Sequence, residues 1–562
     1  FQKANNKFFI APSNIFVKIQ IHFQEHENYI DLVIDFRKIY YKKQLIKKFS
    51  GRIYRLRRRR ACADKMHRLC QKLVHVSRIS SARYLTDYGG KDFNDVVIVS
   101  AVRTPITGFN GNYHALPVAK LGAVAIDAAL KHAAVPPESV QQVYFGNVLA
   151  AGVGQAPARQ ATLLAGLSKR VCCTTVSASC VTGMKTIMFA AQAVRLRLAD
   201  AAIAGGMESL SNVPYYMPRT HLHLGDFTMQ DGLVSDGVPE EFKNKFPKTP
   251  GVTKEDFINY AKESYMRMRK ASRAGLFDLE LVPLRIMQHS RIPLMVTEDE
   301  ERPLLSIMDE LTNYNEKMSP MMGDGASALV LTTNERAMEW NIKPLARIIA
   351  YNESKTDDCD VSTAPTLAIK RLLHHTNYTV NDVSLWELDD SISAVPLTVI
   401  KELELNPEKV NAHGGAVSLG NPIAMSGARL VTHLAHALDP GQIGCAAITN
   451  ETGNASALLI EKISYNEEEN KIPHLTLYTK DNCALCDELI NEMEIYFDGQ
   501  YTIEKVDITK KENVRFLRLY RNDIPVLFFN GQFLCMHKLN VNLLGRKMEK
   551  LRMKNTDGTN IQ

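Results

Sequence analysis

The sequence lacks the features that would hold it in a bilayer or in a disulfide framework. No uninterrupted apolar run reaches the roughly 18 residues that a membrane-crossing helix needs, so we expect no membrane span. The ten cysteines are scattered without regular spacing, which predicts a reducing compartment, and only Cys483 and Cys486 form a close pair. Because no second Cys or His pair stands at metal-ligand spacing, we interpret this pair as redox-active and expect no metal site.

A strong excess of one charge is also missing from the body of the chain. Much of the formal net charge of +7 comes from a leader that contains Arg52, Arg55, Arg57, Arg58, Arg59 and Arg60. A basic tail on a nearly balanced body argues against a nucleic-acid partner, which would require that cluster to persist in the mature protein. The content of 45% hydrophobic and 23% charged residues is typical of a globular protein, and 562 residues predict three or more compact units.

Acidic residues are absent from residues 66–83. In this segment Leu69, Leu73 and Val76 fall on one helical face opposite basic residues, which is the pattern of a mitochondrial transit peptide. We therefore expect a transit peptide over 66–86, a start at Met66 and a place in the mitochondrial matrix; the alternative is a disordered basic tail. Residues 1–65 show no clear period or turn pattern, and we interpret them as a non-native or disordered leader.

The fold class predicted from residue 93 onward is α/β. Residues 96–99 and 143–145 read as short apolar strands, and 121–134 as an alanine-rich helix. The segments 326–331 and 455–460 echo each other, which suggests two similar halves. Residues 207–320 are rich in Met, Pro, His and charge, and they read as an inserted loop domain of the kind that often recognises substrate.

Cys180 is the leading candidate for a catalytic nucleophile. It stands directly before a long helical pattern, where unpaired backbone N–H groups and the helix dipole stabilise a thiolate. The alternative is that Cys180 is a small buried hydrophobic residue. Three further motifs follow in order along the chain: Gly206-Met207-Glu208-Ser209, Gly323-Asp324-Gly325-Ala326 and Gly414-Gly415-Ala416-Val417.

With these motifs, residues 93–463 closely resemble the thiolase family, of the mitochondrial acetyl-CoA acetyltransferase type. The resemblance implies a duplicated fold, with one half at 93–340 that includes the loop domain and the other at 341–463. It also implies coenzyme A thioesters as substrates, no bound cofactor, an acyl-enzyme on Cys180 and a homo-oligomer. Ser319 and Gly420 are the substrate-binding positions that it suggests.

Three positions depart from the family's catalytic pattern. Asn421 stands where the family has a histidine, and an amide cannot accept a proton near neutral pH. Thr449 stands where the family has a second cysteine, which removes a proton from the second acyl-CoA. Asp389 stands where the family has an asparagine that helps to stabilise the oxyanion, and an ionised carboxylate there would repel an enolate. We therefore expect impaired thiolase chemistry, unless His413 or Asp390 reaches Cys180 and serves as a base.

A polar link at 464–471 precedes a separate small domain at 472–553. It contains a strand from His474, the Cys483–Cys486 pair at the start of the next helix, and the segment 523–529. This pattern resembles the glutaredoxin-like branch of the thioredoxin fold, in which Pro525 would be the cis-proline that faces the pair. Cys483 would then be the attacking thiolate and Cys486 the resolving thiol, with glutathione as a candidate partner.

Two functions remain open from the sequence. One is acyl-CoA acyl transfer through Cys180. The other is a catalytically degenerate thiolase scaffold, or an acyl-CoA binder, whose working chemistry is thiol–disulfide exchange in the small domain.

Overall fold

The computed structural model describes eleven stretches of the chain: residues 25–26, 29–32, 54–57, 95–217, 228–237, 252–287, 293–301, 322–356, 361–391, 393–465 and 472–557. The chain divides into two compact units, Phe1–Gly89 and Gly90–Gln562. In the first unit, β1 (Glu25–His26), β2 (Tyr29–Leu32) and β3 (Tyr54–Arg57) form a small antiparallel sheet. The predicted transit peptide at 66–86 lies outside the described residues.

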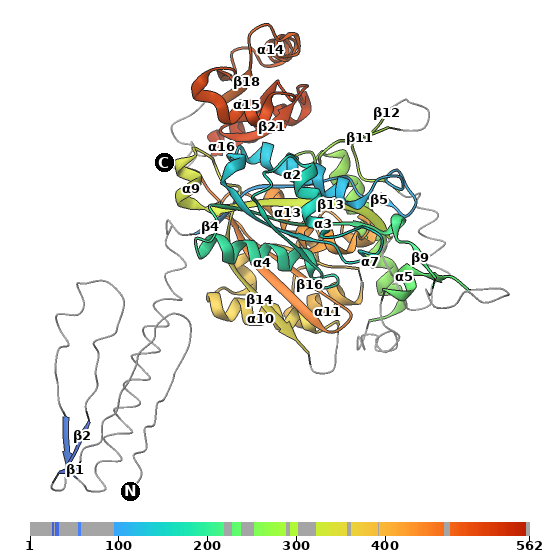
Figure 1. Ribbon diagram of the computed structural model, residues 1–562, viewed down its shortest axis with the longest axis vertical. Helices are drawn as coiled ribbons and strands as arrows, with labels where there is room; N and C mark the ends of the chain where they lie inside the picture. Colours follow the sequence, from blue (N-terminus) through green and yellow to red (C-terminus); the bar gives the residue numbers. More distant parts are fainter. Residues whose placement is uncertain are drawn as a thin grey trace. The chain divides into compact units, whose positions relative to one another are not determined.

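The second unit contains one large mixed sheet built from two similar halves (Figure 1). The strands and main helices of the first half are β4 (Val96–Arg103), α2 (Val118–Ala133), β6 (Val140–Gly146), α3 (Pro157–Leu164), β7 (Cys172–Val176), α4 (Thr182–Arg195), β8 (Ala201–Ser209) and β13 (Gly323–Thr333). Those of the second half are β14 (Ala346–Lys355), α10 (Ala364–Thr376), β15 (Val383–Leu388), α11 (Ala394–Leu403), α12 (Ala416–Leu419), α13 (Ile423–Ala437), β16 (Ile443–Thr449) and β17 (Asn454–Lys462).

The strand order confirms the two halves that the sequence echo predicts. The order is β15-β16-β17-β14-β4-β13-β8-β6-β7, so β4-β13-β8-β6 in one half corresponds to β14-β17-β16-β15 in the other. The echoing segments 326–331 and 455–460 lie in β13 and β17, which hold equivalent places. The halves join where β14 pairs with β4, at Ala346 opposite Ile98 and Arg347 opposite Val97.

Alternating burial along the strands produces a layered arrangement. On β4, Val97 and Val99 pack in one apolar cluster with α2, whereas Val96 and Ile98 pack on the other face with α4 and α13. On β17, Leu458 faces this central cluster while its neighbours pack with α10 and α11. Because successive side chains of a strand point to opposite faces, each half-sheet is covered on both sides, and α4 and α13 form the central layer.

Glycines allow the two central helices to approach closely. A Cβ atom built on Gly183 of α4 would lie 2.6 Å from the backbone N of Ala428, and one on Gly427 of α13 would lie 2.5 Å from the backbone N of Met184. A Cβ on Gly146 would meet both Thr182 at 2.3 Å and the Cβ of Ala424 at 3.4 Å. The N-terminal ends of α4 and α13 therefore lie next to each other.

The insertion between β8 and β13 is described in part. It contains β9 (Tyr215–Tyr216), β10 (Gln230–Asp231), α5 (Gly232–Ser235), α7 (Lys254–Arg273), β11 (Leu284–Met287) and β12 (Pro293–Val296). A capping box between Thr253 and Asp256 begins α7, and the hydroxyl groups of Ser264 and Ser418 join α7 to α12 at 3.0 Å. The insertion therefore contacts the segment that leads into α13.

The small domain has its own four-stranded sheet. Its elements are β18 (His474–Thr479), α14 (Ala484–Phe497), β19 (Thr502–Asp507), α15 (Val514–Tyr520), β20 (Val526–Phe529), β21 (Gln532–Met536) and α16 (Val541–Asp557). The sheet order is β19-β18-β20-β21, with β18 and β19 parallel. This domain contacts α2 of the body, where the Tyr520 hydroxyl donates to the Lys131 carbonyl at 2.9 Å and Asp523 pairs with the Lys131 ammonium at 2.9 Å. Among the residues that the structure describes, no helix is long and apolar enough to cross a membrane.

Replacement of Gly183 by valine tests the close contact of α4 and α13. Because the added Cβ would meet backbone atoms, which cannot rotate away, we expect the free energy of unfolding to fall by about 1–3 kcal/mol or more. Urea unfolding of the purified variant measures this loss. Gly545→Ala, on helix α16, is the control, because its added Cβ would lie at an ordinary 3.9 Å from the Phe497 ring. We expect little or no loss of stability in this variant. Equal effects of the two changes would contradict the proposed packing role of Gly183.

Candidate active site

Cys180 lies in a tight turn immediately before α4. The backbone of Ser179 has a φ of 52°, and the Thr182 hydroxyl accepts from the Ala178 N–H at 2.8 Å and donates to the Ser179 carbonyl at 2.6 Å. Thr182 therefore fixes the turn from the first residue of the helix. The turn directs Cys180 inward, where it is only 5% exposed and packs in the apolar cluster around α4 and α13.

The partner of the Cys180 thiol is a carboxylate. Cys180 Sγ donates to Oε1 of Glu451 at 3.4 Å, although the two residues are 271 positions apart in the chain. Glu451 is half-buried, in the turn between β16 and β17. The side chain of Asn450 organises this turn: its Oδ1 accepts from the N–H groups of Thr452 and Asn454, both at 3.1 Å, and its Nδ2 donates to the Ala178 carbonyl at 3.5 Å. The turn that carries Glu451 is thus tied to the turn that carries Cys180.

The environment of Cys180 favours the thiol over the thiolate. Burial raises the pKa of this thiol well above its ordinary value, and the carboxylates of Glu451 and Asp389 raise it further. Cys180 lies just before a helix, as predicted, but its thiolate is not favoured as expected, because burial and the nearby carboxylates raise the pKa of the thiol. For Cys180 to act as the predicted nucleophile, a base would have to remove its proton.

The residues at the altered positions hold backbone and loop in place. Gly420 ends α12 with a φ of 107°, and Asn421 follows it with its Oδ1 accepting from the Ser426 hydroxyl in the first turns of α13. The Thr449 hydroxyl donates to the Asn454 carbonyl at 3.0 Å and thereby closes the turn after β16. Neither side chain can serve as a base near neutral pH. Ser319, the other predicted substrate-binding position, lies outside the described residues.

Asp389 does not hold a full negative charge at neutral pH. It follows β15, is 1% exposed, and accepts from the Ser391 hydroxyl at 2.6 Å. Burial raises the pKa of Asp389 to about 7, even though the hydrogen bond from Ser391 opposes that shift. The sequence predicts an ionised carboxylate at this position, whereas the buried Asp389 is partly protonated at pH 7.

His413 and Asp390, the alternative bases, bond to other groups. The Asp390 carboxylate accepts from the Ala416 N–H and from the Tyr260 hydroxyl at 3.1 Å. His413 Nδ1 lies 2.9 Å from His433 Nε2 and begins a buried chain of contacts. That chain continues from His433 Nδ1 to Glu280 Oε2 at 2.9 Å, and from Glu280 Oε1 to the Arg103 guanidinium at 2.6 Å.

Glu451 and Glu208 are two residues to which the sequence alone gave no individual role. The buried carboxylate of Glu208 in β8 accepts from the Asn147 amide at 2.7 Å and from the Ala424 N–H at 3.0 Å, and so it links β8 to the segment after β6 and to α13. Burial raises the pKa of Glu208 to about 7 against these hydrogen bonds. The signal was an acidic residue inside an otherwise small and apolar strand. For Glu451, the signal in the sequence was a carboxylate two positions after Thr449, which stands where the family has a cysteine.

Two of the three residues predicted for the redox site of the small domain are bonded to each other. Cys483 and Cys486 form a disulfide, and the Ile524–Pro525 peptide bond is cis. Cys483 is the N-cap of α14, and its Sγ accepts from the Cys486 N–H at 3.3 Å. Cys483 is 9% exposed and Cys486 is 1% exposed, so the first sulfur is the more accessible of the two. Among the described residues, no group of three or more His, Cys, Asp or Glu side chains could hold a metal ion.

Comparison with known families agrees with this geometry. The family model "Thiolase, N-terminal domain" matches residues 96–335, and "Thiolase, C-terminal domain" matches residues 342–462. The chain belongs to the thiolase family. The model "Glutaredoxin-like domain" matches residues 474–549, so the thiolase-family body continues into a glutaredoxin-like domain.

Curated relatives and solved structures cover the same part of the chain. The mitochondrial acetyl-CoA acetyltransferase of Mus musculus is 44% identical over 389 residues, which is 66% of this chain and 92% of the relative. Acetyl-CoA acetyltransferase B, mitochondrial, of Xenopus laevis is 42% identical over 415 residues, 70% of this chain and 99% of the relative. The crystal structure of Acat5 thiolase from Ascaris suum in complex with coenzyme A is 35% identical, with a TM-score of 0.61, and covers 66% of this chain and 100% of its own.

Asp389→Asn tests the electrostatics of this thiolase-family site. Between the ordinary aspartate pKa near 4 and the folded value of about 7, the native state holds more protons than the unfolded state, so wild-type stability falls as pH rises through this window. An amide does not titrate. We therefore expect the free energy of unfolding of the variant, minus that of wild type, to be about 1–3 kcal/mol larger at pH 8 than at pH 5.

Asp382→Asn is the matched control for this experiment. Hydrogen bonds from Thr379 lower the pKa of the exposed Asp382, so this carboxylate is ionised in both states at pH 5 and at pH 8. Its replacement should change stability by the same amount at the two pH values. If Asp389→Asn shows the same absence of pH dependence in urea unfolding, the buried carboxyl does not titrate as described.

Proposed function

We propose that the thiolase body accepts an acyl group from acyl-CoA on Cys180, and that its carbon–carbon bond-forming step is strongly impaired. The observation that carries the first part is the contact between the Cys180 thiol and the Glu451 carboxylate at 3.4 Å. The family membership, and the coenzyme A bound to the Ascaris suum relative, support acyl-CoA as the substrate class. The names of the relatives support a mitochondrial location, while the matrix, the transit peptide and a homo-oligomer remain predictions from sequence.

Glu451 can supply the proton transfer that Cys180 needs. In the forward direction, the Cys180 proton moves to the Glu451 carboxylate as the sulfur attacks the thioester carbonyl carbon. The carbon–sulfur bond to coenzyme A then breaks, and the departing coenzyme A sulfur takes the proton back from Glu451. The acyl group remains on Cys180 as a thioester. The step needs no oxidant, and attack by free coenzyme A reverses it.

The second stage of a thiolase reaction lacks its proton carrier. Formation of a carbon–carbon bond requires removal of a proton from the α-carbon of a second acyl-CoA, and the Thr449 hydroxyl at the family's cysteine position cannot remove it. Loss of a general base lowers rate by about 10²–10⁴-fold. Asn421 stands where the family's histidine activates the nucleophile, so its replacement bears on the first stage, in which Glu451 takes the thiol proton in this proposal.

Labelling with acetyl-CoA tests the first stage alone. We expect the intact protein to gain one acetyl group on Cys180, detected by peptide mass spectrometry, and the Cys180→Ser variant to gain none at this position. Glu451→Gln should slow labelling by about 10²–10⁴-fold, because the amide cannot accept the thiol proton. Glu353→Gln is the control, since this nearby carboxylate pairs with Lys185. Equal labelling rates for Glu451→Gln and wild type would remove Glu451 from the mechanism, and no labelling of wild type would sink the proposed acyl transfer.

Restoring the family residues tests the second stage. Wild type should cleave acetoacetyl-CoA with free coenzyme A very slowly, and the double variant Asn421→His/Thr449→Cys should raise kcat by 10²-fold or more if the pocket is otherwise intact, about the effect of one general base. Spectrophotometric loss of acetoacetyl-CoA measures the rate. Rapid cleavage by wild type would contradict the proposed impairment.

Thiol–disulfide exchange in the small domain is the second candidate function. The observation that favours it is the disulfide between Cys483, the N-cap of α14, and the less exposed Cys486. A helix N-terminus and the Cys486 N–H both stabilise a thiolate at Cys483. Cys483 would attack a disulfide of a partner, Cys486 would then attack the mixed disulfide, and the partner would leave as two thiols. Glutathione remains a candidate partner from the sequence resemblance.

Trapping of mixed disulfides distinguishes the roles of the two cysteines. The Cys486→Ser variant, incubated with oxidised glutathione, should retain one glutathione on Cys483, because the resolving thiol is gone. The Cys483→Ser variant should retain much less at Cys486, which is buried. Intact-mass spectrometry with and without a reductant measures both adducts. Stronger trapping at Cys486 would reverse the assignment.

A further inference from the structure

A cavity of about 830 Å³ lies where the small domain packs on the thiolase body. Residues of α2, β4 and β17 line it from the body, and residues of β18, β20 and α16 line it from the small domain. Its lining includes neither the Cys180 site nor the Cys483–Cys486 disulfide. Pockets that hold small organic ligands have volumes of roughly 300–1,000 Å³, so this cavity has room for one.

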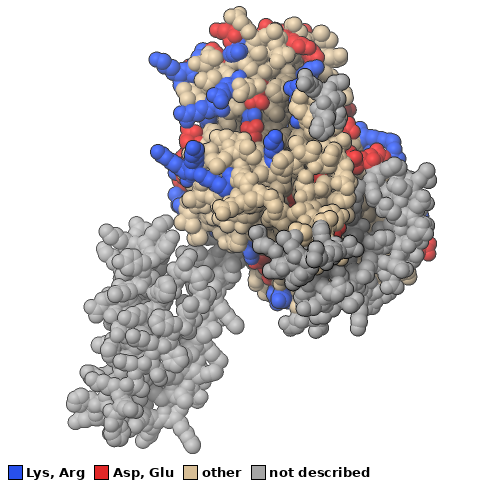
Figure 2. Space-filling view, turned by 45° about the vertical axis from the view of Figure 1, so that its right-hand side comes forward, with Lys and Arg blue, Asp and Glu red and all other residues tan. Residues whose placement is uncertain are grey.

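Basic side chains dominate the charge on the cavity walls. Eight Lys and Arg residues line it, against three Asp and Glu residues. Arg546 pairs with Asp278 at 2.7 Å and Lys550 pairs with Asp439, and both carboxylates lie outside the lining. The space-filling view also shows Lys and Arg side chains gathered along one flank of the described part (Figure 2). The cavity therefore presents a field that attracts anions.

Lys462, Lys547 and Lys550 all line the cavity and influence one another electrostatically. Lys462, the last residue of β17, is half-buried and donates to the Ala435 carbonyl. Burial lowers the pKa of Lys462 to about 7, and the positive charges of Lys547 and Lys550 on α16 lower it further, with Asp439 opposing them. Like charges disfavour one another, and a bound anion would reduce that repulsion.

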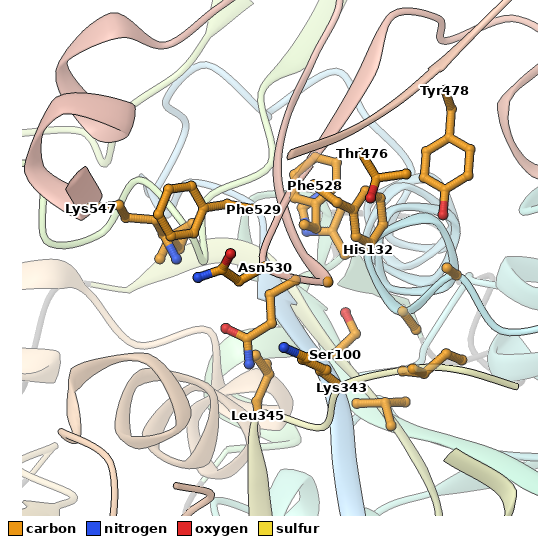
Figure 3. A pocket seen from close by; sticks show the side chains of 18 of the residues that line it. Ser100, His132, Lys343, Leu345, Thr476, Tyr478, Phe528, Phe529, Asn530 and Lys547 are labelled. Carbon is orange, nitrogen blue, oxygen red and sulfur yellow. The ribbon is translucent and has the colours of Figure 1, made fainter. Parts of the chain in front are cut away.

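Flat, uncharged rings lie beside these cations. Phe528 and Phe529 end β20, and the Lys547 ammonium lies 5.6 Å from the centre of the Phe529 ring. His132, near the end of α2, stacks on Phe533 with ring centroids 3.6 Å apart, and burial lowers its pKa to about 3, so the imidazole is neutral. Figure 3 shows His132 near Phe528 on one side, Lys547 next to Phe529 on the other, Asn530 between them and Lys343 below.

We propose that this cavity binds a small organic diphosphate of the nucleoside diphosphate class. Its phosphates would lie against Lys343 and Lys547, and its ring against Phe528 and His132. A single carboxylate would match one ammonium group, whereas two adjacent phosphates match several cations at once. The side-chain amide of Asn530 provides both a donor and an acceptor between the two regions. The site does not depend on the chemistry of Cys180.

Calorimetric titration of the full chain with ADP tests the proposal. We expect saturable binding of one ADP, weaker binding of inorganic pyrophosphate, and no binding of adenosine at the same concentrations. Lys343→Ala and Lys547→Ala should each weaken ADP binding by about tenfold or more, the usual effect of losing one charge-assisted hydrogen bond. Lys547→Arg retains the charge and should bind within a fewfold of wild type, which separates loss of the cation from loss of folding.

The control is Lys480→Ala, an exposed lysine of the small domain that does not line the cavity. It should leave ADP binding unchanged. If ADP binds but neither Lys343→Ala nor Lys547→Ala weakens it, ADP occupies another site, such as the acyl-CoA site, and the proposal is wrong. Absence of ADP binding at millimolar concentration would also overturn it, and equal affinities for pyrophosphate and ADP would overturn the role of the ring-lined wall.

Discussion

The close contact of α4 with α13 is the constraint on which the thiolase body depends. Gly183 and Gly427 let the two backbones approach, and this contact brings the turn before α4 near the segment before α13. The strands of both half-sheets pack on these two helices through one apolar cluster. Glu208 reinforces the arrangement, because its buried carboxylate accepts from the N–H of Ala424 in α13. Any larger side chain at the contact would separate the segments that form the site.

Burial at this helix junction also determines the electrostatics of the site. The same packing that encloses Cys180 removes water from its sulfur and from Asp389, so both groups favour their neutral forms. In the proposed mechanism, the proton of this buried thiol moves to the neighbouring Glu451 carboxylate when the sulfur attacks the substrate. The side chains of Asn421 and Thr449, which cannot carry protons, instead hold the first turns of α13 and the turn after β16. In the proposed mechanism, acyl transfer and carbon–carbon bond formation depend on different residues of the thiolase body.

Much of the fold followed from local pattern, because apolar periodicity and turn residues act over a few positions. The echo between β13 and β17 predicted two halves, and the strand order has them in equivalent places. The small domain was also predicted from its strands and its cysteine pair. Glu451 was not singled out as a partner of Cys180, because the two are separated by 271 residues and meet only when the halves pack. The cavity lined by Lys343 and Lys547 was missed for the same reason, since its walls come from two domains.

The sequence by itself determined the order of the elements, the place of Cys180 before a helix and the absence of a base at positions 421 and 449. These are properties of residue type and short-range spacing, which do not change when the chain folds. Only the tertiary structure decided that Cys180 is a protonated thiol, that Asp389 is partly protonated at pH 7, and that Glu451 is the group in contact with the sulfur. Protonation depends on how much water is removed and which charges come within a few ångströms, and both are set by segments far apart in the chain.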